Sequence, residues 1–399
     1  MRRLLASICA LSLGAAYACS ADDAASPTTD GGADTSADVT TDAAPDAGDA
    51  SEDADAEPTC APFVPPAGCA FDGGLSDRLE CTGLYEDFAR RTLACGVREF
   101  EPGFVLWSDG AAKRRFVYLP PGATIGADDP DQWFFPPGTK LWKEFSIALP
   151  DGGMAVIETR LFSKQQDGTW RWTTYVWSDD GAMAVRTDNG VKNVRGTTYE
   201  IPSQQDCAKC HDGRIDKVLG FDSILMAAPE AKGLVYAELL AKGKLAASPA
   251  PPAASALQIP GTPAERAALG YLHANCGVAC HNASAASGAN QSGLHMKLVA
   301  ANLARAVGTD TVTTGANKRP GGNFPNQPPP PDGGWFAIHP GDLSRSLLPT
   351  RMATRDVTDG GRGQMPPFIT HVVDDAGVAT VSAWISGMTV DAGYPAPAP

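Results

Sequence analysis

Short apolar runs that alternate with Pro and Gly steps mark the stretch from Phe104 to Trp177 as strand-forming. The runs are rich in aromatic and β-branched residues, and six of the eight tryptophans of the chain lie within the stretch. They read RRFVYLPPG, QWFFPPGTKLWKEFSI, MAVIETRLF and WRWTTYVW. Runs of this kind, separated by turn residues, are typical of antiparallel strands. We therefore predict an antiparallel β-domain over residues 59–200, built as a sandwich or an open barrel.

A cluster of charged residues lies near the start of this stretch, at Asp109, Lys113, Arg114 and Arg115. Such a cluster can line a ligand site, but charged residues on strands more often lie on a solvated edge. We predict the solvated edge here.

Helical patterns flank the strand-forming stretch. Before it, the spacing of four apolar residues predicts a short helix within Ser76–Cys95; they are Leu79, Leu84, Phe88 and Leu93. After it, Thr262 is suited to cap a helix with Pro263 in its first turn and Glu265 at its third position. A last amphipathic helix is predicted near the end of the chain, and its apolar face carries Val378, Val381, Ile385 and Met388.

The strand-forming pattern ends near Pro202, and helix-compatible stretches and long loops follow it. The chain thus predicts an α+β protein in which an antiparallel β-domain precedes a mainly α region. SPAPPAASALQIPG, at 248–261, is typical of a linker. It divides the later region into a segment at 201–247, a domain at 262–390 and a tail at 391–399.

The chain begins with MRRLLASICALSLGAAYAC, in which two arginines precede about a dozen apolar residues. This pattern predicts a signal peptide at 1–19 that is too short to span a bilayer. Cys19 at the cleavage point resembles a bacterial lipoprotein signal, although Ala16 stands where a leucine-like residue is usual. We expect an exported lipoprotein in the periplasm or at the cell surface, anchored in the outer membrane. Ordinary cleavage to a soluble periplasmic protein is the alternative.

Residues 20–58 are a low-complexity segment with 12 acidic residues, no Lys or Arg and no aromatic residue. Such a segment buries too little apolar surface to fold, so it is predicted to be a disordered acidic tether. Of the net charge of −14, most belongs to this tether. Without the tether and the two signal arginines the chain carries a charge of −4, which gives nucleic-acid binding no electrostatic support.

Ten cysteines are present, and eight of them follow the signal peptide. Four of the eight fall in one early stretch, and in an exported protein they predict two disulfides. They are Cys60, Cys69, Cys81 and Cys95. Three connectivities are possible, of which Cys60–Cys69 with Cys81–Cys95 is the most local, and the sequence does not choose among them.

CAKCH, from Cys207 to His211, has the form of a c-type haem attachment site. Two thiols separated by two residues add to the two haem vinyl groups, and the following histidine ligates the iron. A zinc site would require further Cys or His ligands, and a thioredoxin-like pair would require a βαβ context. We therefore predict covalent haem c on Cys207 and Cys210, with His211 as iron ligand.

NCGVACHN, from Asn275 to Asn282, also ends in Cys-His but has three residues between its cysteines. A looped turn can absorb the extra residue, which predicts a second haem c on Cys276 and Cys280 with His281 as iron ligand. A disulfide between these two cysteines is the alternative. The helix predicted just before the motif favours haem, because small cytochrome domains have a helix there.

No motif marks the distal iron ligands of the two predicted haems or the residues that bind their propionates, so these are predicted from single residues. Met365, in the GQMPPF stretch 84 residues after His281, lies in a polar, Gly-rich loop where core packing is not expected, so it is predicted as the distal ligand of the second haem. Met226 is the candidate for the first haem, with any other histidine or an open site as alternatives. Arg345 and Arg351 are candidate partners of haem propionates, and surface ion pairs are the other interpretation.

From about Cys81 to its end the chain resembles a family of bacterial dihaem c-type cytochromes with an N-terminal all-β region. The resemblance rests on LWSDGAAKRRFVYLPPG, FPPGTKLWKEF, IETRLF, YEIPSQQDCAKCH, YLHANCGVACHN and QMPPF, and it covers about 310 residues. The family usually has two residues between the cysteines of its second site, so this chain departs from it by one insertion. The resemblance implies two covalent haem c groups with iron, and a cytochrome c-like region after the β-domain.

The sequence therefore predicts an exported dihaem cytochrome that transfers single electrons between redox partner proteins, which it does not identify. One alternative is a dihaem peroxidase-like enzyme, which would need an open iron beside acid–base residues; no Glu or His is persuasively placed for that role. The other alternative is a surface ligand-binding module in which the haems are structural.

Overall fold

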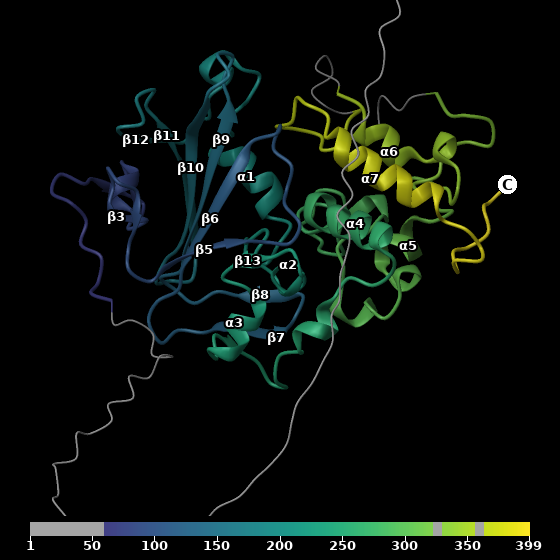
Figure 1. Ribbon diagram of the computed structural model, residues 1–399, viewed down its shortest axis with the longest axis horizontal. Helices are drawn as coiled ribbons and strands as arrows, with labels where there is room; N and C mark the ends of the chain where they lie inside the picture. Colours follow the sequence, from purple (N-terminus) through teal and green to yellow (C-terminus); the bar gives the residue numbers. More distant parts are fainter. Residues whose placement is uncertain (1–59, 322–328, 356–362) are drawn as a thin grey trace, which may run out of the picture. The chain divides into compact units, whose positions relative to one another are not determined.

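The structure is a computed structural model that describes residues 60–321, 329–355 and 363–399. These residues form one compact unit. The predicted signal peptide and acidic tether lie outside the described residues. The α+β class is confirmed, because antiparallel strands dominate the earlier part of the unit and helices the later part (Figure 1).

The main sheet has seven strands in the order β12-β11-β10-β9-β6-β5-β13, and all neighbours are antiparallel. Its strands are β5 (Val97–Glu101), β6 (Ala112–Tyr118), β9 (Lys140–Ala148), β10 (Met154–Lys164), β11 (Trp170–Trp177), β12 (Ala184–Thr187) and β13 (Lys232–Gly233). The predicted apolar runs supply its central strands β6, β9, β10 and β11. The first and last strands of this order do not pair, so the sheet is open.

A smaller sheet joins β14 (Leu245–Ala246), β7 (Ile125–Asp129) and β8 (Gln132–Phe134), with β14 parallel to β7. Strands β13 and β14 both follow the first Cys-His motif in the chain. The segment at 201–247 therefore completes both sheets.

The N-terminal segment does not form the helix predicted within Ser76–Cys95. It forms two short antiparallel pairs and one 3₁₀ turn, namely β1 (Phe71–Asp72), β2 (Leu75–Ser76), η1 (Leu79–Cys81), β3 (Tyr85–Asp87) and β4 (Thr92–Leu93). Gly83 and Arg91 have left-handed backbone angles, with φ of 82° and 54°, which a continuous right-handed helix excludes. Leu79 and Leu84 are instead fully buried in a core cluster that covers one face of the main sheet.

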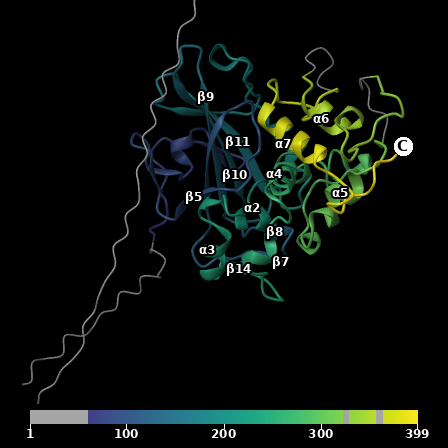
Figure 2. The same ribbon diagram turned by 45° about the vertical axis from the view of Figure 1, so that its right-hand side comes forward.

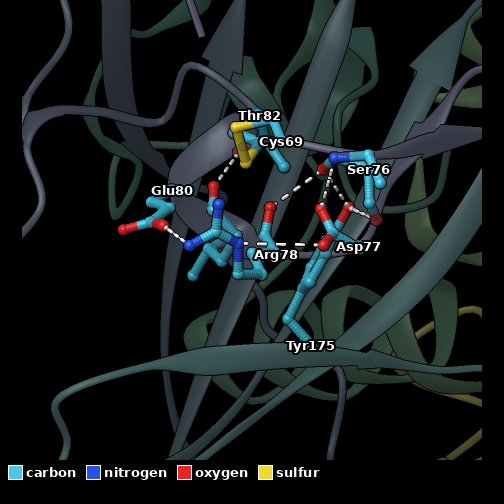
Figure 3. Close-up of a disulfide and its surroundings, with 10 residues drawn as sticks. Cys69, Ser76, Asp77, Arg78, Glu80, Thr82 and Tyr175 are labelled. Carbon is cyan, nitrogen blue, oxygen red and sulfur yellow. Dashed lines mark hydrogen bonds and ion pairs between the residues drawn. A yellow bond between two sulfur atoms is a disulfide. The ribbon is translucent and has the colours of Figure 1, made fainter. Parts of the chain in front are cut away.

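Two disulfides tie this segment together, Cys60–Cys95 and Cys69–Cys81. The pairing is nested, so the most local of the three possible connectivities is not the one adopted. Figure 3 shows the second disulfide beside Arg78, whose guanidinium pairs with the carboxylates of Asp77 and Glu80.

Helices follow residue 203 and gather beside the main sheet (Figures 1 and 2). They are α1 (Gln204–His211), α2 (Ser223–Ala227), α3 (Tyr236–Ala241), α4 (Pro263–Leu272), α5 (Asp310–Gly315), α6 (Leu347–Met352) and α7 (Asp375–Ser386). The 3₁₀ turn η2 (Val194–Gly196) precedes them, and other 3₁₀ turns lie between them, at η3 (Ala254–Leu257), η5 (Asn290–Ser292), η6 (Ala300–Asn302), η7 (Ala306–Gly308) and η8 (Leu343–Arg345). Among the described residues no helix has the length and apolar character needed to cross a bilayer.

Two of the predicted helices are confirmed. Helix α4 begins as expected, because the Thr262 side chain accepts from the Glu265 amide and the Glu265 carboxylate accepts from the Thr262 amide. Helix α7 buries Val381 and Ile385 completely, on the face predicted to be apolar.

One apolar core runs across the predicted boundary near residue 200. It contains Phe100 and Trp133 from the strands together with Leu269 and Trp384 from the helices. The stretch predicted as a linker, 248–261, also packs into this core through its buried residues Leu257 and Ile259. The boundary is thus a change of secondary structure within continuous packing.

Candidate functional site

The first Cys-His motif forms helix α1. Ser203 caps this helix by accepting from the Asp206 amide, and Asp206 in turn accepts from the Ser203 amide. His211, the last residue of α1, stacks on Phe162 of β10 with ring centroids 4.1 Å apart. Its Nδ1 is hydrogen-bonded to the carbonyl oxygen of Lys217, so Nε2 keeps its lone pair for a metal.

The second motif follows helix α4 through a π-turn, η4 (His273–Gly277), that contains Cys276. The amide of His281 donates to the carbonyl oxygen of Cys276 at 2.8 Å, a bond that spans five residues rather than four. A π-turn holds one residue more than an α-turn, so the inserted residue of the motif is absorbed without breaking the backbone hydrogen bonds.

His281 repeats the arrangement found at His211. Its Nδ1 lies 3.1 Å from the carbonyl oxygen of Leu294, and the imidazole is 8 % exposed. A carbonyl partner fixes the tautomer in which Nδ1 carries the proton and Nε2 is the ligating atom. Burial lowers the pKa of His281 to about 4 and that of His211 to about 3, which keeps both imidazoles neutral as metal binding requires.

A cavity of about 1100 Å³ lies against the second motif. Cys276, Cys280 and His281 line it, and Met365 lines it from the later loop. The remaining wall is largely apolar and includes Leu294, Leu347, Leu348, Pro366, Pro367, Phe368 and Val378. Pockets that bind cofactors hold about 300–1,000 Å³, so this cavity is large enough for a porphyrin.

The cavity contains the methionine predicted as a distal ligand and two that the sequence did not single out. Met365 is half-buried, and its amide donates to the carbonyl oxygen of Arg351 at 2.9 Å. Met296 and Met352 also line the cavity. Met226, the candidate for the first haem, is 1 % exposed within the apolar core and does not line this cavity.

The two arginines predicted to meet propionates have different surroundings. Arg351 lines the cavity. Arg345 does not line it: its guanidinium lies 4.9 Å from the centroid of Phe336 and donates to the carbonyl oxygens of Gly333 and Ala398.

The two motifs are in direct contact. The Cys210 thiol donates to the Cys280 sulfur, which raises the pKa of Cys210 and lowers that of Cys280. Gly213, just after α1, approaches the second motif so closely that a Cβ there would lie 1.9 Å from the carbonyl oxygen of Ala279. Only glycine permits this approach. No pattern in the sequence indicates this contact between Gly213 and Ala279, which are 66 residues apart.

All four motif cysteines are free and half-buried. The alternative of a Cys276–Cys280 disulfide is therefore not what the structure contains. Burial raises the pKa of Cys207 to about 11 and that of Cys276 to about 12, so neither is a thiolate at neutral pH. Within the described ranges, no group of three or more His, Cys, Asp or Glu side chains is placed to hold a bare metal ion.

The charged cluster near the start of the strands is not the solvated edge predicted from the sequence. Arg115 is 4 % exposed, and Lys113 donates to the carbonyl oxygen of Leu106 at 2.7 Å. Only Arg114 fits the prediction, since it forms an exposed pair with Glu99. Strand β6 alternates its faces, so Arg114 points to solvent while Arg115 points inward, toward the side that carries α1.

Comparisons of the chain with protein-family models, with curated proteins and with solved structures give no match. The chemistry of the site therefore rests on its own residues. The second site has two thiols, an imidazole with a free Nε2, a thioether and apolar walls around one cavity, and this donor set fits haem c. The first site has the same thiols and imidazole on α1, which face the main sheet.

Proposed function

We propose that this chain is an exported dihaem c-type cytochrome that transfers single electrons. The observation that carries the proposal is the cavity that Cys276, Cys280 and His281 share with Met365. Thiols, imidazole and thioether around one apolar cavity are the protein groups that attach and ligate haem c. When bound, the haem iron supplies a one-electron centre.

Each residue of the second site has a distinct role in this proposal. Cys276 and Cys280 attach the haem, and His281 ligates its iron through Nε2 while Leu294 holds the imidazole in orientation. Met365 is the distal ligand, and a His/Met pair raises the reduction potential. The apolar wall restricts water, which favours the less charged iron and also raises the potential.

Cys207, Cys210 and His211 hold the other haem in a cytochrome c-like region. The contact between Cys210 and Cys280 supports a function in which electrons pass between the two centres, because the thiols that attach the two haems touch. The partners are redox proteins that donate and accept electrons.

The haem content of the mature chain tests the proposal. We expect two haems per chain by pyridine haemochrome and by intact mass, when the chain is produced in a host that matures c-type cytochromes. The variant Cys276→Ala/Cys280→Ala should retain one. A mature chain with one haem, and a Cys276–Cys280 disulfide in its peptide map, would overturn the dihaem proposal.

Electron transfer and peroxidase-like chemistry predict different responses to added ligands. An electron carrier needs no open iron, so carbon monoxide and peroxide should leave the absorption spectrum unchanged. A spectral shift at one haem would indicate an open iron and favour the enzyme over the electron carrier.

We also propose that Cys19 anchors the chain in the outer membrane, on the cell surface or on the periplasmic side. The signal sequence that ends at Cys19 and the acidic stretch that follows it motivate this. Cys19→Ala should move the protein from the membrane fraction to the soluble fraction. If the variant stays with the membranes, the lipid anchor is wrong.

A further inference from the structure

Three basic residues form one row across the main sheet. In the strand register, Arg115 of β6 pairs with Lys143 of β9, and Lys143 pairs with Arg160 of β10. Residues at paired positions of an antiparallel ladder lie on the same face, so the three side chains point to one side. We call Arg115, Lys143 and Arg160 the basic row.

The basic row faces the first Cys-His motif. Phe162, two residues after Arg160 on β10 and therefore on the same face, carries the stacked imidazole of His211. Lys143 and Arg160 are close enough to the motif to interact electrostatically with Cys210 and Cys207. The row thus lies on the sheet surface that helix α1 covers.

The side chains of two members of the row are hydrogen-bonded to no anion among the described residues; Glu101 attracts Arg115 without forming an ion pair. Arg160 donates two hydrogen bonds, from Nε and Nη2, to the two carboxylate oxygens of Glu158. Glu158 also accepts from the Tyr199 hydroxyl at 2.8 Å. Arg115 is 4 % exposed, yet the side chains of Arg115 and Lys143 form no hydrogen bond or ion pair with any described residue. Burying cations without an anion is costly, so such residues normally meet one.

We propose that the basic row binds the two propionate carboxylates of the haem held by Cys207, Cys210 and His211. This inference rests on the proposed function. Two unpaired cations match two carboxylates in number, and the planar guanidinium of Arg115 is suited to bind one of them through two parallel hydrogen bonds. The β-region is therefore part of the first haem site.

The reduction potential of the first haem is the readout. Cations next to a haem stabilise the reduced, less positively charged iron, so Arg115→Met/Lys143→Met should favour the oxidised form. We expect the reduction equilibrium constant of the first haem to fall at least tenfold, which is about 59 mV for one electron. Met365→Ala should change the potential of the second haem alone. The step of the redox titration that shifts in this variant therefore belongs to the second haem, and the other step belongs to the first.

Arg114→Met is the matched control, because Arg114 lies on the same strand with its side chain exposed on the opposite side of the sheet. It should leave both potentials unchanged. Lys143→Arg keeps the positive charge and should keep the potential of the first haem. It is measured in place of the double variant if the double variant does not fold. A first-haem potential that is equal in the double variant and the Arg114→Met control would overturn the inference.

A second measurement separates the haem carboxylates from a free small anion. If propionates occupy the row, adding sulfate or phosphate should leave the spectrum of the haem-loaded chain unchanged. Saturable spectral changes that disappear in Arg115→Met/Lys143→Met would show that the row is a small-anion site and would overturn the inference. Fewer than two haems in the unmodified chain would instead count against the proposed function itself.

Discussion

At the scale of single residues, the second site offers three thioether groups to one cavity. Met296, Met352 and Met365 all line it. Met365 differs from the other two because it lies in an irregular loop and is half-buried, whereas Met296 and Met352 are almost fully buried in the core. A ligating sulfur needs access to the cavity more than it needs packing partners, which favours Met365.

Replacing this residue tests the assignment. Met365→Ala should abolish the weak long-wavelength band of sulfur-to-iron charge transfer and lower the potential of the second haem, because a methionine ligand favours the reduced iron. We expect a change of at least tenfold in the reduction equilibrium constant, about 59 mV. Absorption spectroscopy and a redox titration measure both effects.

Met352→Ala is the control for this prediction. It removes a thioether from the same cavity and should retain the band. If the band survives in Met365→Ala and is lost in Met352→Ala, the ligand is Met352 and the sequence assignment is wrong.

Between elements, a buried charged network joins helix α2 to the π-turn before the second motif. Asp222 caps α2 by accepting from the Leu225 amide, and its carboxylate lies 3.7 Å from Nε2 of His273. His273 accepts from the Leu298 amide through Nδ1, so its Nε2 carries the proton that faces Asp222. Burial alone would raise the pKa of Asp222, but His273 and Arg214 outweigh it and bring the pKa to about 2.

This shift predicts how stability changes in acid. A folded-state pKa below the unfolded value of about 3.9 stabilises the fold above pH 4, and this contribution is lost as the pH falls from about 4 to about 2. Asp222→Asn should lower the free energy of unfolding by about 2 kcal/mol at pH 7, because the neutral amide no longer attracts His273 and buried Arg214. The free energy of unfolding of this variant should also fall less than that of the unmodified chain as the pH drops below 4.

Urea unfolding at pH 7, 4 and 2.5 measures both effects. The exposed Asp151→Asn variant is the control and should change stability by less than about 0.5 kcal/mol. An Asp222→Asn variant as stable as this control at pH 7 would contradict a role for the network.

Local signals predicted several elements, and tertiary packing decided the others. The Thr262 capping box and the alternating strands were predictable because they depend on neighbouring residues. The helix expected around Leu84 was wrong, since two disulfides and left-handed residues determine that segment. The inward orientation of Arg115 was also missed, because alternation separates the faces of a strand but does not tell which face the rest of the chain will cover.

At the scale of the whole unit, strands and helices share their packing. The main core joins Phe100 and Trp133 to Leu269 and Trp384, and β13 and β14 return to the sheets after the first motif. The cysteine spacing predicted the two motifs, but their contact through Gly213 and Ala279 depends on this packing. The composition shift near residue 200 is real, yet no gap in the core accompanies it.

This packing predicts that the unit unfolds in one step. A core shared by both regions means that neither can unfold without exposing apolar surface of the other, so the transition should be cooperative. Far-UV circular dichroism follows the backbone, and Soret circular dichroism follows the surroundings of the haems. In a urea titration of the haem-loaded chain, the two curves should have the same midpoint. If instead the backbone signal of the strands is lost at lower urea than the Soret signal, the β-region and the haem region are separate folding units, and the basic row would then leave the first haem before the helices unfold.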